Sequence, residues 1–264
     1  MPHWNPDDYE KHSSAQKEWG GALIEKLHLC GEEQVLDIGC GDGGLTVMIA
    51  ARLPGGTVTG IDLSADMIAH AQSRYPPSEY PNCNFACMDV RKIAYESLFD
   101  VAFSNAALHW VPEQDRVLEK VSLALKPGGR LLFQMGGQGT AAGFFAVART
   151  LMAEHPWKQY FSGFSPTWRF LSDTEYIILL EKAGFRPVRV ELFPVDMVHA
   201  NRQGLEGWIR TTWLPFLERL PASMKEEFIT GLADRYLASH PPDSEGRTCV
   251  KMVRLEAEAG KGAG

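Results

Sequence analysis

Apolar and polar positions change along the chain in blocks that predict strands alternating with helices. The apolar runs typical of buried strands are the start of VLDIGCGDG, then TVTGID, NFACMDV, FDVAFSNA and RLLFQMG. Stretches with apolar residues at helical spacing lie before and between them: residues 13–29, LTVMIAARL, SADMIAHAQSRY and QDRVLEKVSLAL. Strands that alternate with helices in this way form a parallel sheet covered on both faces.

The alternation breaks after Gly136. Residues 137–172 are rich in aromatic side chains, and we expect one or two short helices there. A helix over SDTEYIILLEKAGF and a strand over RPVRVELFPV restore the pattern. Helical runs at 202–219 and 222–239 precede a last strand in RTCVKMVRLEAEA. We therefore predict an α/β fold, a doubly wound, Rossmann-like, mostly parallel seven-stranded sheet with a helical lid inserted around the C-terminal strands.

The glycine-rich loop of VLDIGCGDG follows the first predicted strand. Glycine at every second position lets the backbone turn tightly and approach a ligand closely. Ligands of parallel α/β sheets bind beyond the carboxyl ends of the strands, where this loop lies. Gly39, Gly41 and Gly44 satisfy the fingerprint G-x-G-x-x-G, and Asp62 follows about 20 residues later, as expected for a carboxylate that binds ribose hydroxyls. The pattern indicates an adenosine-containing ligand.

The charge of Asp37 helps to choose among adenosine ligands. Asp37 precedes the loop in D-x-G-x-G-x-G, where its carboxylate would repel the pyrophosphate of NAD. S-adenosylmethionine instead carries a sulfonium and an ammonium, which a carboxylate complements. A structural role for Asp37, bracing the glycine amides, is compatible with the same ligand.

Composition and charge exclude several other classes of partner. The net charge is −7 and basic residues are thinly spread, so we expect no nucleic acid partner. No apolar run reaches membrane length and the N-terminus does not resemble a signal peptide, so we expect a cytoplasmic protein with no membrane partner. The five cysteines lack further ligands at metal-binding spacing, so we expect reduced thiols and no metal. We expect a monomer.

Several motifs together resemble one family. VLDIGCGDG, TGIDLS, CMDVRK, FDVAFSNAALHW and LKPGGRLLF are similar to the class I S-adenosylmethionine-dependent methyltransferases, and the resemblance covers about residues 15–190. WNPDDY, HSSAQ and NAALHWVPEQ make it most similar to the trans-aconitate and juvenile hormone acid methyltransferases, which methylate carboxylates of small molecules. The resemblance implies N-terminal cofactor-closing helices at 1–30, a cofactor-binding core at 31–136 and a helical substrate lid at 137–264, interleaved with the last strands.

The resemblance also implies a cofactor site. Gly39, Gly41 and Gly43 would line the methionine part of S-adenosylmethionine, and Asp62 would hold the ribose. The backbone carbonyl of Asn105 would meet the methionine ammonium. Further members of the expected cofactor site are Asp37, Leu63 and Met67.

At the adenine end, Met88, Asp89 and Val90 would frame the base, with Asp89 accepting a hydrogen bond from its exocyclic amine. Gln16 and Trp110 would close over the cofactor near the transferring methyl. Without the family, Asp89 is a strand-end carboxylate and Trp110 a core residue, and only their positions just past strands favour the functional interpretation.

The catalytic residues depend on the methyl acceptor. An ionised carboxylate needs no general base, and we predict O-methylation of such a group on a small molecule. A phenol, amine or carbon acid would have to lose a proton, and His109 is the candidate base. The alternative is a histidine that packs or hydrogen-bonds beside Trp110. We take His109 and Trp110 as the catalytic candidates.

Acceptor specificity should reside in the aromatic insertion and in the helices at 202–239. Arginine suits anionic acceptors because its planar fork pairs with carboxylates. The candidate substrate residues are Trp4, Tyr9, His109, Arg149, Arg169, Trp208 and Arg210. GWIRTTWLPFLERL parallels a region of the trans-aconitate enzymes that carries an arginine before a proline, but Leu214 precedes Pro215 here. This departure argues against trans-aconitate itself.

Two rival classes share the glycine loop. A NAD-dependent oxidoreductase would share Asp62 but would carry catalytic Tyr-Lys chemistry at the fourth strand, where Ser104, Asn105 and Ala106 lie instead. A catalytically idle cofactor-binding protein of the same fold would show the same motifs.

Overall fold

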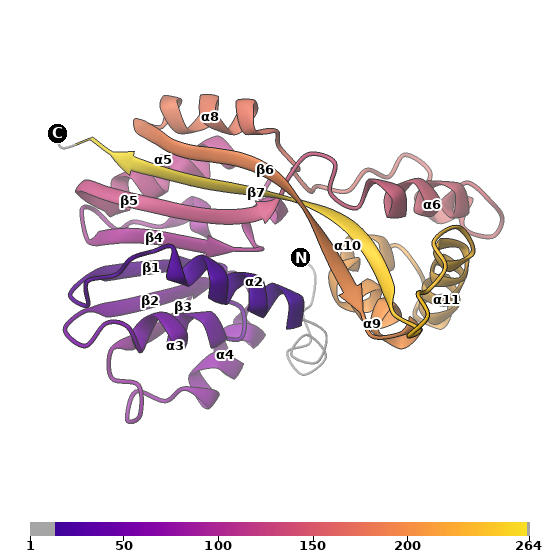
Figure 1. The fold of residues 1–264 in the computed structure, drawn as a ribbon, viewed down its shortest axis with the longest axis horizontal. Coiled ribbons are helices and arrows are strands. Elements are labelled where there is room, and N and C mark those ends of the chain that lie inside the picture. Colours follow the sequence, from indigo (N-terminus) through magenta and orange to yellow (C-terminus); the bar gives the residue numbers. More distant parts are fainter. Residues whose placement is uncertain (1–13, 263–264) are drawn as a thin grey trace. The chain divides into compact units, whose positions relative to one another are not determined.

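A computed structural model describes the backbone of residues 14–262 and the side chains from Trp19 onward. Its seven strands form one sheet in the order β3-β2-β1-β4-β5-β7-β6 (Figure 1). β1 to β5 pair in parallel, whereas β7 is antiparallel to β5, which confirms the predicted mostly parallel sheet. The strand bounds are Gln34–Ile38 (β1), Thr57–Asp62 (β2), Cys83–Cys87 (β3), Phe99–Asn105 (β4), Leu125–Gly136 (β5), Phe185–His199 (β6) and Thr248–Lys261 (β7).

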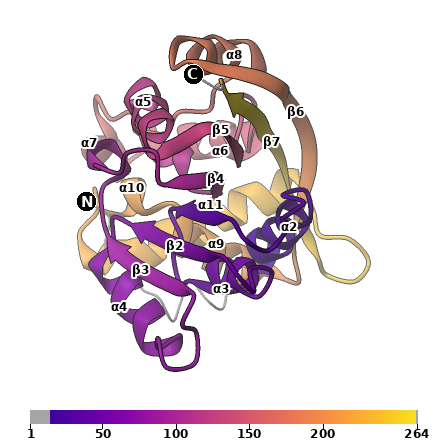
Figure 2. The ribbon, with the colours of Figure 1, turned by 90° about the vertical axis from the view of Figure 1, so that its left-hand side faces the viewer.

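Helices cover both faces of this sheet (Figure 2). One face packs against α2 and α3 through Leu23, Ile24 and Ile49, and the other packs against α5 and α8 through Val117 and Tyr176. The helix bounds are Ser14–Glu25 (α2), Gly44–Ala50 (α3), Ala65–Arg74 (α4), Gln114–Ala124 (α5) and Asp173–Lys182 (α8), with single 3₁₀ turns at Val90–Lys92 and Leu108–Trp110. The apolar residues that recur at helical spacing in the sequence therefore face the sheet, as expected for amphipathic helices.

Side-chain caps begin two of these helices. Ser64 accepts a hydrogen bond from the Met67 amide at the start of α4. Ser172 and Glu175 form a reciprocal capping box at the start of α8. Both caps satisfy amide groups that a helix N-terminus leaves without intrahelical partners.

One predicted boundary is wrong. The strand predicted in RLLFQMG, from Arg130, begins instead at Leu125, directly after α5, so Lys126–Gly129 lies inside β5. The pairing with β4 shifts register between Phe99 and Val101, so these residues bulge opposite Asp100. Lys126 Nζ donates to both Asp100 carboxylate oxygens at 2.9 and 2.8 Å, which fixes the bulge.

The chain divides into two compact units. The sheet unit comprises Gln16–Gln138, Trp168–Phe193 and the chain from Arg254, and the helical unit includes Gly139–Thr167 and Pro194–Val253. The helices of the helical unit are Ala142–Met152 (α6), Lys158–Phe161 (α7), Arg202–Thr212 (α9), Leu214–Leu217 (α10) and Ala222–Ser239 (α11). β6 and β7 each contribute residues to both units.

Aromatic packing forms the core of the helical unit. The Phe144 ring lies 5.1 Å from Trp208, 4.9 Å from Trp213 and 4.8 Å from Tyr236, measured between centroids. The helical run expected at 202–219 is broken near Trp213, because Pro215 stands in the first turn of α10, where proline is tolerated. Much of the aromatic content of this region therefore fills a core.

Candidate active site

The glycine loop turns sharply after β1. Close packing requires glycine most clearly at position 39. Gly39, Gly41 and Gly43 have φ values of 73°, 55° and 79°, which favour glycine. A Cβ on Gly39 would lie 2.1 Å from Cβ of Ala107, the residue just before the 3₁₀ turn after β4. The loop backbone therefore lies against the segment that follows β4, at the carboxyl edge of the sheet.

Asp62, the last residue of β2, is tied to the same loop. Its Oδ2 accepts a hydrogen bond from the Gly41 amide at 3.0 Å, and its Oδ1 accepts one from the Ser64 amide at 2.8 Å. Burial raises the pKa of Asp62, although these amide donors oppose the rise. The structure thus brings together the carboxylate and the loop that the sequence paired as a ribose site.

Asp37 lies at the back of the loop, 2% exposed on β1. Thr46 Oγ1, from α3, donates a 2.7 Å hydrogen bond to Asp37 Oδ2. Burial, together with the nearby charge of Asp62, raises the pKa of Asp37 to about 7, while the Thr46 hydrogen bond opposes the rise. A positive ligand nearby would favour the ionised form of this carboxyl group.

Met88, Asp89 and Val90, expected around adenine, follow β3, and two further residues of the expected cofactor site, Leu63 and Met67, follow β2. The Met88 amide donates to the Asp62 carbonyl at 2.8 Å, which aligns these two strand ends. Val90 and Met67 are buried, whereas the Leu63 side chain is 44% exposed and offers an apolar surface. Asp89 pairs with Arg91, whose Nη2 lies 2.8 Å from Asp89 Oδ2, and this hydrogen bond lowers the pKa of Asp89.

His109 and Trp110 lie in a 3₁₀ turn after β4, within an aromatic group. The His109 ring stacks on Phe170 with a centroid separation of 5.6 Å, and Trp110 meets Trp168 edge to face at 5.2 Å. The Arg169 amide donates to the His109 carbonyl at 2.9 Å, which holds residues 168–170 beside this turn.

His109 is a neutral histidine in this setting. Burial of the ring and the positive charge of Arg254 lower its pKa to about 3. The Gly136 amide donates to Nδ1 at 3.4 Å, so the ring proton resides on Nε2. A histidine of such low pKa is a weak proton acceptor near neutral pH.

The arginines expected to bind the acceptor differ in their surroundings. Arg149 and Arg169 are exposed, in the helical and the sheet unit respectively. Arg210 forms a bidentate pair with Glu226, with N···O distances of 3.1 and 3.0 Å. Trp208 is buried in the aromatic core of the helical unit. Trp4, Tyr9 and the side chain of Gln16 lie outside the described residues.

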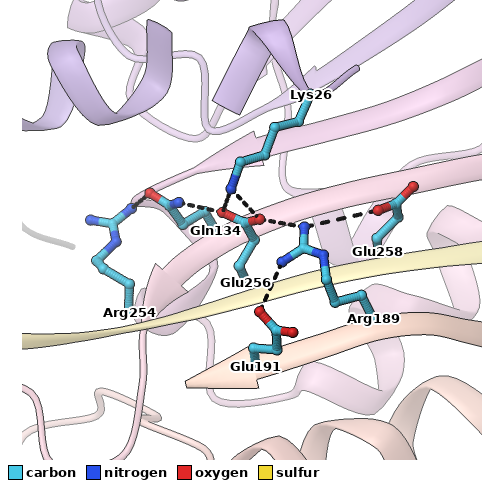
Figure 3. A network of polar contacts seen from close by, with 7 residues as sticks. All are labelled: Lys26, Gln134, Arg189, Glu191, Arg254, Glu256 and Glu258. Carbon is cyan, nitrogen blue, oxygen red and sulfur yellow. Dashed lines mark hydrogen bonds and ion pairs between the residues drawn. The ribbon is translucent and has the colours of Figure 1, made fainter. Parts of the chain in front are cut away.

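A buried polar network in the sheet unit was not anticipated from the sequence (Figure 3). Asn105, Gln134 and Glu256 occupy one row across β4, β5 and β7, because each pairs in register with the next. Gln134 Nε2 donates to Glu256 Oε2 at 2.8 Å, and Arg254 Nη2 donates to Gln134 Oε1 at 2.7 Å. A polar residue inside the apolar run RLLFQMG was the available signal, together with charges alternating in VRLEAEA.

Two cations stabilise the fully buried carboxylate of Glu256. Lys26 Nζ donates to both of its oxygens at 2.7 and 2.9 Å, and Arg189 also donates to it. Burial alone would raise the pKa of Glu256, but these hydrogen bonds and the one from Gln134 outweigh it and lower the pKa. Such a paired charge is costly to disrupt by removing one partner.

The groups around the loop fit a positively charged adenosyl ligand. The Gly39 backbone can approach a ligand closely, Asp62 offers a carboxylate to a diol, and the buried Asp37 favours a cation. No group of three or more His, Cys, Asp or Glu side chains that could ligate a metal ion exists among residues 14–262. Within the same part of the chain, no helix is long and apolar enough to cross a membrane.

Comparisons with known proteins agree with this chemistry. Residues 35–129 match the family model described as a methyltransferase domain. The trans-aconitate 2-methyltransferase of Methylobacterium nodulans is 29% identical over 259 residues, covering 97% of both chains.

Solved structures share the fold. The YcgJ protein of Bacillus subtilis has a TM-score of 0.64 at 17% identity, covering 94% of this chain and all of that one. Phosphoethanolamine N-methyltransferase 2 of Haemonchus contortus, solved with phosphomonomethylethanolamine and S-adenosylhomocysteine, has a TM-score of 0.63 at 20% identity, covering 97% of this chain and 57% of that one. The chain thus carries a methyltransferase domain over residues 35–129, shares its fold with solved methyltransferases, and is similar to the trans-aconitate 2-methyltransferases over nearly its whole length.

Proposed function

We propose that the chain methylates a carboxylate oxygen of a small organic acid. The observation that carries the proposal is the state of His109, the candidate base beside the end of β4. With a pKa of about 3 and an amide directed at Nδ1, its ring is poorly suited to deprotonate a phenol, an amine or a carbon acid. A carboxylate is already ionised at neutral pH and needs no base.

The roles of the site residues follow from this acceptor. S-adenosylmethionine supplies, when bound, a methyl group on a positively charged sulfur. Asp62 would hold the ribose, Asp37 would favour the positive charge, and the loop at Gly39 would allow close approach. The main contribution of the protein is then to align the acceptor oxygen with the methyl carbon and to exclude water.

The relatives support a carboxylate as the methyl acceptor, but they do not identify the acid that carries it. A relative named trans-aconitate 2-methyltransferase matches 97% of the chain at 29% identity. Leu214 stands before Pro215, where the resemblance implies an arginine, so we propose an acid other than trans-aconitate. The expected lid at 137–264 would provide its specificity and stays a prediction.

The first experiment is calorimetric titration with S-adenosylhomocysteine, with NAD as the control. Turnover of S-adenosylmethionine is then measured with a panel of mono-, di- and tricarboxylic acids and with phenols and amines. The expected product is a methyl ester, recognised by mass spectrometry and by its hydrolysis in mild base. A product that resists this hydrolysis, such as an ether or a methylamine, would overturn the proposal.

A further inference from the structure

The Asp89 carboxylate is clamped by an arginine two positions further along the chain. Asp89 follows β3 at the carboxyl edge of the sheet, and its side chain is only 10% exposed. Arg91 Nε donates to Asp89 Oδ1 at 3.0 Å, and Arg91 Nη2 donates to Asp89 Oδ2 at 2.8 Å. A guanidinium that donates to both oxygens of a carboxylate fixes the plane of that group as well as its charge.

The two oxygens of Asp89 are not equally engaged. Asp89 is the N-cap of the 3₁₀ turn Val90–Lys92, so its Oδ1 also accepts from the Arg91 amide at 3.0 Å. Among the described residues, Oδ2 has Nη2 as its own donor and shares Nε, which lies farther from it at 3.2 Å. Because a carboxylate oxygen can accept two hydrogen bonds, Oδ2 keeps room for one more donor.

A second carboxylate holds the guanidinium from its other side. Arg91 Nη1 donates at 2.9 Å to Glu113, the residue before α5. Arg116 Nε, from α5, donates to the Arg91 carbonyl at 3.0 Å. Glu113 is half-exposed, so its pair with Arg91 contributes little stability. These contacts keep the Arg91 side chain extended in the position from which it clamps Asp89.

The clamp also keeps Asp89 ionised. The hydrogen bonds from Arg91 lower the pKa of Asp89, against the burial that would raise it, and the charges of Arg91 and Lys92 act in the same direction as the hydrogen bonds. An ionised carboxylate accepts hydrogen bonds and donates none. Adenine offers it a donor, its exocyclic amine.

We propose that Arg91 is a positioning residue for adenine recognition: it orients the Asp89 carboxylate so that Oδ2 accepts from the exocyclic amine. The resemblance implies the role of Asp89, and the role of Arg91 goes beyond it. Arg91 acts through Asp89 and confers selectivity for a purine that carries an amine. The proposal needs S-adenosylmethionine as the cofactor and does not depend on the acceptor acid.

Arg91→Met tests the proposal by binding alone. Calorimetry compares S-adenosylhomocysteine with its 6-deamino analogue, in which hydrogen replaces the exocyclic amine. We expect the unmodified protein to prefer the first ligand by about tenfold or more, since a hydrogen bond to a charged group is lost in the second. In Arg91→Met this preference should fall to about threefold or less, because the carboxyl group loses its orientation and its buried charge loses its partner.

Three further variants separate positioning from folding, with thermal unfolding as the check on the fold. Glu113→Gln breaks the pair on the other side of Arg91, and we expect the preference to stay within about twofold of the unmodified protein. Arg91→Lys restores the charge without the fork and should recover part of the preference. In an Asp89→Ala background, Arg91→Met should change the preference by less than about twofold, because the two residues act as a unit.

Several results would overturn the proposal. Equal losses for the two ligands in Arg91→Met would mean a structural role, and an equal effect of Glu113→Gln would assign the loss to the contact with α5. A preference that survives in Asp89→Ala would place the amine elsewhere. Failure of the unmodified protein to bind either ligand would end this proposal and the cofactor assignment together, whereas absence of turnover with every acid would end only the proposed function.

Discussion

Thr46 and Asp37 share a buried hydrogen bond of 2.7 Å between Oγ1 and Oδ2, one turn into the helix that follows the glycine loop. One donor only partly offsets the loss of water around the carboxylate, and the pKa of Asp37 rises to about 7 from its ordinary value of 3.8. The folded protein therefore binds this proton more tightly than the unfolded chain, so this group lowers stability as pH rises from about 4 to about 7.

Asp37→Asn should accordingly stabilise the protein at high pH and not at low pH. We expect the free energy of unfolding to increase on the order of 2 kcal/mol near pH 8 and to change little near pH 4, because the amide cannot ionise. Urea unfolding followed by tryptophan fluorescence at the two pH values measures the difference. The variant should also lose more affinity for S-adenosylmethionine than for S-adenosylhomocysteine, which lacks the sulfonium charge. A stability change of the same size at both pH values would contradict the raised pKa.

Gly39→Ala should destabilise the loop by more than backbone strain alone. The added methyl meets Ala107 Cβ at 2.1 Å, and φ is 73°. We expect a loss of about 2–5 kcal/mol of stability and a loss of S-adenosylhomocysteine binding. Gly128→Ala is the matched control, since φ is 76° there and the methyl meets nothing within 4 Å, so it should cost only about 1–2 kcal/mol. Equal costs for the two variants would show that Ala107 gives way.

Asp62→Ala should weaken both S-adenosylhomocysteine and 5′-methylthioadenosine by roughly tenfold or more, because the two ligands share the ribose. Titration calorimetry checks the affinities, and thermal unfolding checks that the fold remains. Normal binding by a folded Asp62→Ala variant would mean that the ribose lies elsewhere.

His109→Phe should keep most of the activity if the ring serves for packing. Phenylalanine preserves the stack on Phe170 and loses only the long hydrogen bond from Gly136. We expect turnover of a carboxylate acceptor to fall by less than about fivefold, whereas loss of a general base would cost about 10²–10⁴-fold. Single-turnover rates at saturating acceptor make the measurement. A loss in the larger range would establish His109 as a base and favour another acceptor class.

Trp110→Ala should reduce turnover more than stability. The ring is partly exposed and meets Trp168 at its edge, so its removal leaves no large internal cavity. We expect turnover to fall by about tenfold or more, with less than about 1.5 kcal/mol of stability lost. Comparable losses of about 3 kcal/mol or more in stability would place Trp110 in the core.

The succession of strands and helices along the chain was predictable because strands such as β1 and β4 carry apolar residues that are mostly buried, as strands covered on both faces do. β2 was predicted to the residue over Thr57–Asp62, where Pro54, Gly55 and Gly56 separate it from the preceding helix. The start of β5 was predicted too late in the chain because the residues Lys126–Gly129 are held in the strand by tertiary contacts. Their Pro-Gly-Gly sequence is typical of a helix stop, but pairing of Lys126 with Asp100 extends the strand through them.

The site was predictable where it depends on backbone geometry. Gly39 and Asp62 are recognisable from spacing, because the loop and the strand end are local in the chain. Arg254 and Glu256 were not, since a charged residue alternating with Leu255 and Ala257 is typical of a strand with one solvated face. Their burial depends on α2 and the residue after it, because Trp19 and Lys26 contact Arg254 and Glu256 from the other end of the chain.

β7 follows β6 in the chain but lies between β5 and β6 in the sheet. While the ribosome is still synthesising α9 to α11, the nascent chain already contains β5 and β6 but lacks β7, the strand that lies between them in the finished sheet. The exposed edges of β5 and β6 invite pairing with other chains during that interval. Arrival of β7 fills the gap and inserts Glu256 between Lys26 and Arg189, so the sheet closes and its charges pair in the same event. Protein refolded from denaturant has β7 available from the start and escapes this interval, so any need for a chaperone should be greatest during synthesis.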